Sequence, residues 1–373
     1  MANSTEEKNE AMDLNKHNNV AIMAGGIGSR FWPMSRSTNP KQFLDILNTG
    51  KTLIQQTFDR YAKFIPIENI YVITANAYIS LVKKQLPDMK EENILGEPFR
   101  KNTAPCIAYI SLKLFLKDPE SRLIVAPSDN LIFETDEFIK TSLQALEFAT
   151  KTNSLVTLGV NPTYPNTGYG YIQHDSKEIN GGVYKVKTFT EKPDLELAKT
   201  FLKSGDFLWN AGIFFWKTAV ILDAFEKFLP EIHEVFIAEK NRLNTDEEID
   251  ALNEIYPQCT SISIDFGIME KADNVYIIPA TFGWGDLGTW NSAWENMDKD
   301  YLGNAVTGKE VTIIDATQCM VHVPDNKLVI LQGLDDYIVV DTKDVLLICK
   351  REKEQAIKDY VADVRRFKSE KYL

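Results

Sequence analysis

The feature that most constrains this chain is a glycine-rich turn placed directly after a short apolar run, in the stretch VAIMAGGIGSRFWPMSRSTNPKQFL at residues 20–44. The run predicts a buried strand that ends at Ala24. Three glycines follow, which let the backbone turn sharply and bring its N–H groups close to an anion: Gly25, Gly26 and Gly28. Arg30 and Lys41 then supply cationic side chains. The stretch therefore predicts a polyphosphate-binding turn after a strand.

Two better-known glycine loops do not fit this stretch. A P-loop needs Gly-x-x-x-x-Gly-Lys-Ser/Thr, but five residues after Gly25 stands Arg30, with no Lys-Ser or Lys-Thr behind it. A dinucleotide-binding turn needs a third glycine where Phe31 stands. An ordinary strand-to-helix turn remains the alternative, and the cations that follow favour the phosphate site over it.

Composition bounds the class of protein. The chain has 373 residues, 44% of them apolar, which is enough for one large and one small domain. Its 41 basic and 53 acidic residues give a net charge of −12, and no basic run of the kind that follows a nucleic-acid backbone is present. We therefore expect a soluble protein that does not bind nucleic acid and whose few motif cations carry information.

The cysteine spacing and the first 18 residues indicate the cellular compartment in which the protein is expected. The four cysteines stand far apart without C-x-x-C spacing, which predicts reduced, buried thiols. Residues 1–18 are polar and lack the apolar core of a signal peptide, and no later run approaches the length of a membrane span. The sequence predicts a cytoplasmic protein without a membrane partner, with 1–18 as a polar tail.

Short apolar runs alternate with helical patterns over the first 150 residues. This rhythm predicts a doubly wound α/β sheet, mainly parallel and covered by helices on both faces. Ligands bind such sheets beyond the carboxyl ends of the strands, where Gly25 and the segment Pro127-Ser128-Asp129 both fall. From Ser154 onward, strands and turns mix with helices, and this half is expected to shape a second substrate site.

The sequence pattern changes in the last part of the chain. Beyond Asp300, short apolar runs alternate with Asp, Asn and Gly turns, which predicts a small β-rich module, either of ordinary strands or of solenoid turns, closed by a helix. The predicted division is a tail at 1–18, a catalytic domain at 19–300 and a β-rich domain at 301–373. The last of these is a candidate interface for a homodimer.

Carboxylates in two loops are candidate metal ligands. Asp129 follows a predicted strand that ends at Ala126, and Asp286 lies in the glycine-flanked segment WGDLG. Mg²⁺ takes one or two carboxylates and completes its octahedron with phosphate oxygens and water. Asp129 and Asp286 are therefore the predicted Mg²⁺ ligands, with Asp265 in reserve. An Asp after a strand also serves as a simple cap, so this assignment depends on the other motifs.

A further group of motifs fits a sugar phosphate. Glu191 and Lys192, in TEKP at the end of a strand, place an acceptor beside a cation. Asn210, in WNAG, offers an amide between aromatic residues. Tyr169-Gly170 begins a glycine-rich aromatic strand on which a ring can pack. Each motif also has a purely structural interpretation. Glu191 and Lys192 could form an ordinary exposed ion pair, Asn210 could satisfy buried backbone groups, and Tyr169-Gly170 could belong to a tight hairpin.

The segment EPFRKNTAP opens a helix that runs to Leu116. Asn102 or Thr103 is the expected N-cap, with Pro105 in the first turn. Because the segment lies beside the predicted crevice, Glu97 and Asn102 are also candidates for contacting the edge of a nucleotide base.

Taken together, these motifs resemble the mannose-1-phosphate guanylyltransferases (GDP-mannose pyrophosphorylases) of the bacterial type, within the sugar-1-phosphate nucleotidyltransferases. The resemblance extends from Val20 to the end of the chain. It is carried, in order, by GGIGSRFWPMSR with PKQFL, EPFRKNTAP, APSDN, TGYGYI, FTEKP, WNAGIFFW, SIDFGIMEK and FGWGDLGTW. FWP, NTAP, WNAG and DLGTW favour the guanylyl and mannose branch over thymidylyl or uridylyl relatives.

The resemblance implies a Rossmann-like mixed sheet of the glycosyltransferase-A type with a small β-helix-like domain, and transfer of GMP from GTP to mannose 1-phosphate with Mg²⁺. Arg30 and Lys41 would hold the triphosphate, and Lys192 and Glu191 the sugar phosphate and sugar, so Arg30, Lys41 and Lys192 are the expected catalytic residues. No protein nucleophile or general base is required. The expected nucleotide contacts are Ala24, Gly25, Gly26, Gly28, Ser29, Glu97, Asn102, Thr103 and Ser128; the sugar-phosphate contacts are Tyr169, Gly170, Glu191, Lys192 and Asn210.

Two positions depart from the family pattern. Asn130 stands where many relatives carry His, and Lys101 where they usually carry Arg. Both bear on selectivity for GTP. Only His322 lies beyond residue 300, so the histidines of an appended isomerase module are missing and no isomerase activity is expected. Another sugar-1-phosphate nucleotidyltransferase and a catalytically silent nucleotide-sugar sensor are the alternatives.

Overall fold

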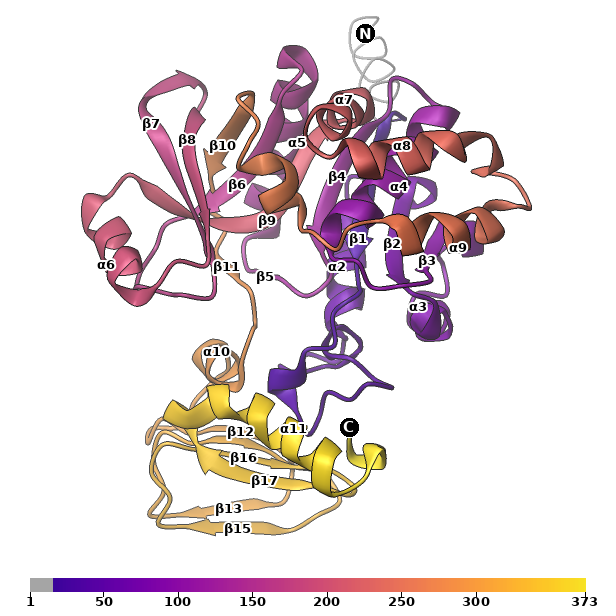
Figure 1. The fold of residues 1–373 in the computed structure, drawn as a ribbon. Coiled ribbons are helices and arrows are strands. Elements are labelled where there is room, and N and C mark those ends of the chain that lie inside the picture. The colour runs from indigo at the N-terminus through magenta and orange to yellow at the C-terminus, as the bar shows by residue number, and fades with distance from the viewer. Residues whose placement is uncertain (1–15) are drawn as a thin grey trace, which may run out of the picture. The chain divides into compact units, whose positions relative to one another are not determined.

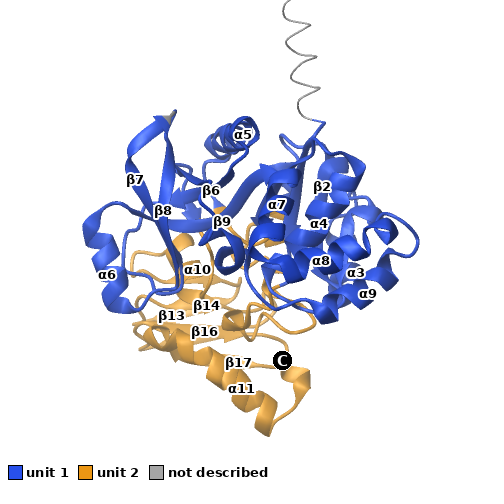
Figure 2. Cartoon of the chain, turned by 45° about the horizontal axis from the view of Figure 1, so that its top comes forward, with its two compact units in different colours: residues 1–25, 58–127, 132–284 blue, residues 26–57, 128–131, 285–373 orange. Residues whose placement is uncertain are grey.

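The computed structural model describes residues 16–373, which group into two compact units (Figure 2). Unit 1 contains the described chain up to residue 25 together with residues 58–127 and 132–284. Unit 2 contains residues 26–57, 128–131 and 285–373. The units do not follow the linear order of the chain, because the segment after the glycine turn groups with the last part of the sequence. The linear division at residues 18 and 300 stays a prediction.

Unit 1 is built on a nine-stranded mixed sheet (Figure 1). Its strand order is β3-β2-β1-β4-β9-β6-β10-β8-β7. β1 pairs parallel with β2 and β4, whereas β9 is antiparallel to both β4 and β6. The strands are β1 (Asn18–Met23), β2 (Ile70–Ala75), β3 (Ile94–Glu97), β4 (Arg122–Pro127), β6 (Leu155–Val160), β7 (Gly170–Asn180), β8 (Val183–Glu191), β9 (Phe207–Lys217) and β10 (Val275–Pro279). The predicted α/β sheet is confirmed, and β9 in its middle is an element that the alternation did not predict.

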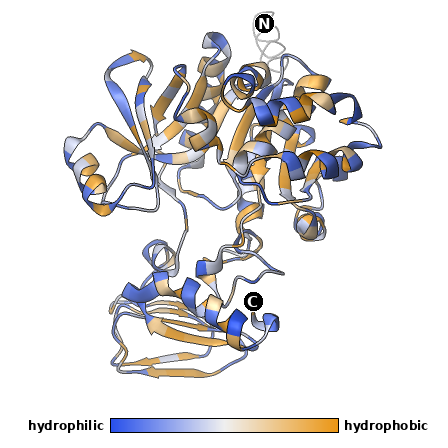
Figure 3. Cartoon of the chain, in the orientation of Figure 1, coloured by the Kyte–Doolittle hydropathy of each residue, from blue (hydrophilic) through white to orange (hydrophobic). Residues whose placement is uncertain are grey.

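Helices pack on this sheet, and the central strands are the most apolar part of unit 1 (Figure 3). The helix α4 is buried from Ala104 to Leu114, as expected for a helix between a sheet and other helices. The helices are α3 (Ile79–Gln85), α4 (Thr103–Lys117), α5 (Thr135–Thr152), α6 (Leu195–Ser204), α7 (Thr218–Phe228), α8 (Pro230–Ala238) and α9 (Glu248–Gln258). Among the described residues, none of the helices combines the length and apolarity that crossing a bilayer needs.

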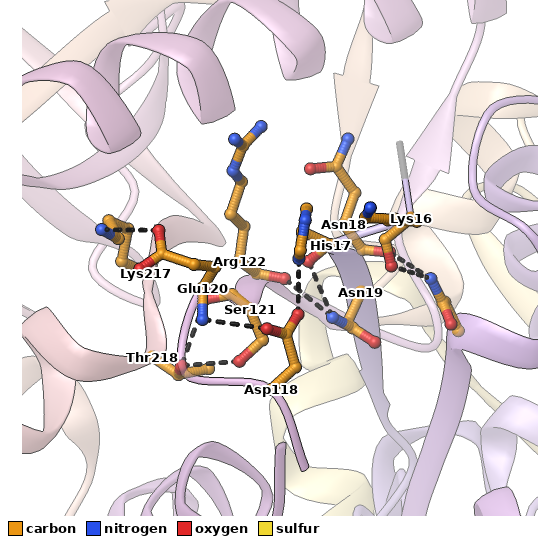
Figure 4. Close-up of polar contacts among 11 residues, drawn as sticks. Lys16, His17, Asn18, Asn19, Asp118, Glu120, Ser121, Arg122, Lys217 and Thr218 are labelled. Atoms are coloured by element: carbon orange, nitrogen blue, oxygen red, sulfur yellow. Dashed lines mark hydrogen bonds and ion pairs between the residues drawn. The ribbon is translucent and has the colours of Figure 1, made fainter. Parts of the chain in front are cut away.

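Polar contacts fasten the beginning of β1 (Figure 4). His17 Nδ1 lies 2.6 Å from Asp118 Oδ2, and Asn19 Nδ2 donates to the carbonyls of His17 at 2.9 Å and Arg122 at 3.3 Å. These contacts hold β1 in register with β4, so that Met23 pairs with Pro127 and both strands end at the same level. The polar segment predicted at 1–18 lies, up to residue 15, outside the described residues.

Unit 2 contains a small solenoid of short strands. β12 (Ala305–Thr307), β14 (Met320–His322) and β16 (Tyr337–Asp341) pair in parallel, and β17 (Leu346–Lys350) closes this sheet antiparallel to β16. β13 (Val311–Ile314) and β15 (Val329–Gln332) form a second parallel pair. Parallel pairing of successive short strands is the pattern of stacked solenoid turns, which confirms the β-helix-like prediction.

The remaining elements connect or cover these bodies. Within unit 2, α10 (Trp290–Asn296) and α11 (Ile357–Phe367) pack against the solenoid. The hydrophobic core that they share with it contains Ile357 of α11 together with the strand residues Met320, Ile338 and Val340. At the unit boundaries lie α2 (Leu53–Tyr61), β5 (Leu131–Ile132) and β11 (Trp284–Gly285).

Candidate functional site

Two loops leave the carboxyl ends of neighbouring strands in unit 1. β1 ends at Met23 and the adjacent β4 at Pro127. At Gly25 and Pro127 respectively, the chain then passes from unit 1 into unit 2. The predicted phosphate loop and the predicted metal loop therefore both begin at one edge of the sheet and continue in unit 2.

Gly28 has a conformation and a neighbour that only glycine tolerates. Its φ is +68°, in the left-handed region, and a Cβ at this position would lie 2.3 Å from the Cβ of Lys41. The Lys41 backbone N–H donates to Ile27 O at 3.3 Å, and Gln42 Nε2 donates to Gly26 O at 3.0 Å. The PKQFL segment thus lies directly against the glycine loop, which is why a cation eleven residues downstream of Arg30 belongs to the same site.

Lys41 is buried and makes three polar contacts through its ammonium group. Nζ lies 2.8 Å from Asp129 Oδ2, 2.7 Å from Leu287 O and 3.2 Å from Asp286 O. Only 6% of Lys41 is exposed. An ammonium group has three N–H donors, and all three are engaged. Lys41 therefore links the loop of Asp129 to the loop of Asp286 across a long sequence separation, a role that the sequence did not reveal.

The two predicted metal ligands thus lie on loops that meet at one cation. Asp286 Oδ1 accepts from the Gly288 N–H at 3.0 Å, which fixes part of its carboxylate, and the Asp129 side chain keeps 30% exposure. Among the described residues, three His, Cys, Asp or Glu side chains do not converge into a metal site made of protein alone. Two carboxylates on adjacent loops nevertheless fit Mg²⁺, which completes its shell with phosphate oxygens and water.

Arg30 interacts electrostatically with one basic and one acidic side chain of unit 2, Lys358 and Glu354. The Nε of Arg30 is buried and has no hydrogen-bond partner within residues 16–373. Its positive charge is the main cause that lowers the pKa of Lys358, and it partly offsets the burial that raises the pKa of Glu354. A buried guanidinium N–H without a partner is costly unless an anion satisfies it. Arg30 is therefore suited to bind a phosphate. Arg30, Lys41, Asp129 and Asp286 form what we call the loop cluster.

A second group of side chains lies on the strands of unit 1. Gly170 of β7 pairs directly opposite Glu191 at the end of β8, and Lys192 forms an ion pair with Glu191. A Cβ on Gly170 would lie 2.5 Å from Glu191 Oε2, so a glycine is needed for the carboxylate to lie there. The Glu191 side chain is 11% exposed and that of Lys192 is 62% exposed. The acceptor is thus held in place while the cation remains accessible.

Asn210 of β9 completes this group with most of its hydrogen-bonding capacity already used. Its Nδ2 donates to Asp265 Oδ1 at 2.9 Å, and its Oδ1 accepts from the Gly212 N–H at 3.0 Å and from Thr157 Oγ1 at 3.2 Å. Within the part of the chain that the structure describes, the second N–H of the amide has no acceptor and is left for a ligand. Gly170, Glu191, Lys192, Asn210 and Asp265 form what we call the strand cluster, and Tyr169 adjoins it because its carbonyl accepts from the Lys192 N–H.

Asp265 belongs to the strand cluster and has different partners from the two loop carboxylates. It begins a π-helical turn, Asp265–Met269. Burial, together with the negative charge of Glu191, raises its pKa to about 6. A carboxylate inside the apolar run ISIDFGIM is costly unless it has polar partners. The reserve role of Asp265 as a metal ligand stays a prediction.

Glu97 is buried next to the first glycine of the loop. A Cβ on Gly25 would lie 3.9 Å from Glu97 Oε2, and Tyr256 donates to Glu97 Oε1 at 3.0 Å. Burial raises the pKa of Glu97 to about 7. The proximity to Gly25 agrees with a place near a nucleotide, whereas the partner Tyr256 was not predicted by any motif.

Several other predicted nucleotide contacts have structural partners. Asn102 is the N-cap of α4, and its side chain accepts from the Thr103 N–H at 2.9 Å. The Thr103 hydroxyl accepts from the Ile264 N–H at 2.8 Å. Ser128 is 3% exposed, and its carbonyl accepts from Thr57 Oγ1 at 3.1 Å. Capping and loop fixation account for these contacts, and their nucleotide-binding roles stay predictions, as do those of Ala24 and Ser29.

Comparison with known families divides the chain at about residue 305. The nucleotidyl transferase family model matches residues 19–301. A model described as the MannoseP isomerase/GMP-like beta-helix domain matches residues 308–364. The first match covers well over half of the chain and contains every residue of both clusters.

Individual relatives agree with these matches. The chain is 36% identical over 346 residues to the alginate biosynthesis protein AlgA of Pseudomonas fluorescens, covering 91% of this chain and 70% of that protein. It is 34% identical over 352 residues to a mannose-1-phosphate guanylyltransferase of Salmonella montevideo, covering 92% and 73%. Among solved structures, a mannose-1-phosphate geranyltransferase from Thermus thermophilus matches with a TM-score of 0.84 at 29% identity, over 94% of this chain and 99% of that one.

Proposed function

The chain belongs to the nucleotidyl transferase family, and from this premise we propose that it transfers GMP from GTP to α-D-mannose 1-phosphate, giving GDP-mannose and pyrophosphate. The observation that carries the proposal is the pair of clusters, one with cations and two carboxylates on loops, the other with a carboxylate, a cation and an amide on strands. The name of the Salmonella relative supports the guanylyl and mannose specificity.

The loop cluster is proposed to bind the triphosphate. Arg30 offers a buried N–H that no other described residue accepts, and the turn at Gly28 lies against Lys41. Since the three donors of Lys41 are engaged, a phosphate oxygen must replace one of its acceptors. Asp129 is the acceptor to be replaced, because its carboxylate is also the proposed metal ligand. Asp129 and Asp286 would hold Mg²⁺, which neutralises charge on the phosphates when bound.

The strand cluster is proposed to bind mannose 1-phosphate. Glu191 accepts hydrogen bonds from sugar hydroxyls, the remaining Nδ2–H of Asn210 donates one, and the accessible ammonium of Lys192 neutralises the phosphate. Tyr169, next to Gly170, offers a ring beside the sugar. Recognition by a carboxylate and an amide fits a polyol, since each hydroxyl both donates and accepts.

The reaction needs little covalent help from the protein. A sugar-phosphate oxygen attacks the α-phosphorus of GTP, the bond from the α-phosphorus to the bridging oxygen of the β-phosphate breaks, and pyrophosphate carries that electron pair away. The attacking oxygen is already ionised, so no general base is required. The chain's residues act by positioning the substrates and by neutralising charge.

The proposed selectivity for GTP rests on fewer observations than the proposed reaction class. Asn130 is buried, with 7% exposure, and Lys101 Nζ donates to Pro257 O at 3.5 Å. Both differ from the common family residues without changing the charges on which the chemistry depends. Another nucleoside triphosphate or hexose 1-phosphate is the alternative within the class.

The test is pyrophosphate release measured over a matrix of nucleoside triphosphates and hexose 1-phosphates with Mg²⁺. The proposal predicts the highest kcat/KM for GTP with mannose 1-phosphate. A higher value for another pair would replace the substrates and leave the reaction class. No activity with any pair, together with tight binding of GDP-mannose, would identify a nucleotide-sugar sensor instead.

A further inference from the structure

The segment that follows the glycine loop is fastened to the end of the described chain. Trp32, which is 7% exposed, donates from its indole Nε1 to Tyr372 O at 2.7 Å. Ser37 Oγ donates to Leu373 O at 2.9 Å. Both contacts lie inside unit 2 and join residues more than 330 positions apart. The loop is thus attached to a part of the sequence that the nucleotidyl transferase model does not include.

Arg36 supplies a charged attachment to the solenoid. Its Nη2 lies 2.8 Å from Asp344 Oδ1 and donates to Thr342 Oγ1 at 3.3 Å, while its Nε donates to Pro33 O at 2.6 Å. The side chain of Arg36 is only 13% exposed. A charge-assisted contact of a largely buried guanidinium is stronger than an ordinary surface pair. This contact holds the loop to the turn between β16 and β17.

Trp290 supports the same segment from the start of α10. Its Nε1 donates to Trp32 O at 3.3 Å, and its ring packs edge-on against that of Phe31, with 5.0 Å between centroids. Phe31 and Trp290 are fully buried. The backbone of residues 31–32 therefore has both an apolar and a polar anchor.

The attachment reaches the glycine loop itself through Ser35. The Ser35 hydroxyl donates to Ile27 O at 2.6 Å, and Ile27 lies between Gly26 and Gly28. A shift of residues 32–37 is therefore transmitted to the backbone that is proposed to face the triphosphate. A loop of this kind has no strand of its own to order it, so distant contacts decide how mobile it is.

We propose that the segment from Tyr337 to Leu373 is a positioning part of the triphosphate site, holding residues 26–37 in their binding conformation before the nucleotide arrives. Trp32, Arg36 and Asp344 are the positioning residues. The inference rests on the proposed function for the identity of its ligand, whereas the contacts that hold residues 32–37 in place do not depend on that function. A loop that is ordered in advance loses less conformational entropy when the nucleotide binds. Loosening this loop should therefore weaken nucleotide binding and leave the binding of the sugar phosphate unchanged.

The test compares Asp344→Ala with Asp325→Ala. Asp325 pairs with Lys309 at 2.9 Å in the same solenoid, and both partners of that pair are exposed, so its removal is a matched control. Amide hydrogen exchange of residues 26–37 is measured first, in the complete chain without substrates. Asp344→Ala should speed this exchange several-fold, whereas Asp325→Ala should leave it unchanged.

The second readout is kinetic. For Asp344→Ala, the KM for GTP should rise about threefold to tenfold, since a charged hydrogen bond is lost, while the KM for mannose 1-phosphate stays within twofold. Trp32→Phe, which keeps a ring and loses only the indole N–H, should give the same pattern, and Asp344→Asn should restore part of the loss.

Each result decides a separate point. Unchanged exchange and unchanged KM for GTP in both Asp344→Ala and Trp32→Phe would overturn the proposal, as would an equal change in Asp325→Ala. Faster exchange with equal rises in both KM values would show a purely structural role and also overturn it. If the wild-type protein transferred no nucleotide to any sugar phosphate, the proposed function would fail, and the exchange data alone would decide the fastening.

Discussion

The two clusters differ in what holds their side chains in place. In the strand cluster, Glu191 of β8 and Asn210 of β9 lie on two strands that both pair with β7, and short-range contacts such as the close approach of Glu191 to Gly170 fix them. In the loop cluster, Lys41, Asp129 and Asp286 lie outside the strands of the large sheet, and the two-residue strands β5 and β11, which pair with each other, adjoin the loops of Asp129 and Asp286. Contacts between distant parts of the sequence order them instead, with a buried lysine at the centre. One cluster derives its order from strand pairing and the other from cross-links.

The largest effect is expected for Asp129→Ala, which removes a proposed metal ligand and a partner of Lys41. The kcat/KM should fall at least about 100-fold, because charge neutralisation at the phosphates is the proposed main source of catalysis. Initial rates over a range of Mg²⁺ concentrations test this. Activity within tenfold of wild type would remove Asp129 from the site.

Lys41→Met and Lys192→Met should separate the clusters by stability. Lys41→Met leaves buried carbonyls and Asp129 without their cation, so it should lower the free energy of unfolding by about 2–4 kcal/mol as well as reduce activity. Lys192→Met changes an exposed side chain and should cost activity alone. Urea unfolding measured beside kinetics makes the comparison. Equal losses of stability would contradict the cross-linked account of the loop cluster.

Asp265→Asn should change the pH dependence of the strand cluster. The pKa of Asp265 is raised to about 6, and Asn210 donates to its carboxylate, so sugar-phosphate binding should strengthen as pH rises through 6 and the carboxyl ionises. With Asn at this position, the rise should flatten. The KM for mannose 1-phosphate from pH 5 to 8 measures this. An unaltered profile would show that Asp265 does not titrate there.

The smallest effect concerns Glu97 and stability. Its pKa is raised to about 7 in the folded protein from the ordinary 4.5, so the folded state retains a proton that the unfolded state loses. This group therefore makes stability fall as pH rises from about 4.5 to 7, and Glu97→Gln should remove that part of the slope. Thermal unfolding at several pH values tests this, and identical slopes would contradict the assigned burial effect.

Local patterns predicted much of this molecule. The strand before Gly25, the loop after Pro127 and the strand before Glu191 all follow from apolar runs and turn residues. The place of β9 between β4 and β6 did not follow, because antiparallel pairing across the chain leaves no local periodicity. The partners of Lys41 did not follow either, since Asp286 lies 245 positions away.

The same limit applies to the contacts that attach residues 32–37 to the last residues of the described chain. The tryptophan of FWPMSR is visible in the sequence, but nothing near it indicates that its indole donates to Tyr372 O. Asp265 is different, because a carboxylate within a buried apolar run is a local signal of a special role. Non-local contacts, more than local conformation, are therefore what the structure adds.

The central claim is that the loop cluster binds the nucleotide and the strand cluster the sugar phosphate of one transfer reaction. Its most direct test is the initial rate of GDP-mannose formation with both substrates varied, in Arg30→Met and Lys192→Met. Arg30→Met should raise the KM for GTP at least about tenfold and leave the KM for mannose 1-phosphate within twofold, and Lys192→Met should do the reverse. If both variants raised the same KM, or if the wild-type protein formed no GDP-mannose, the account would be contradicted.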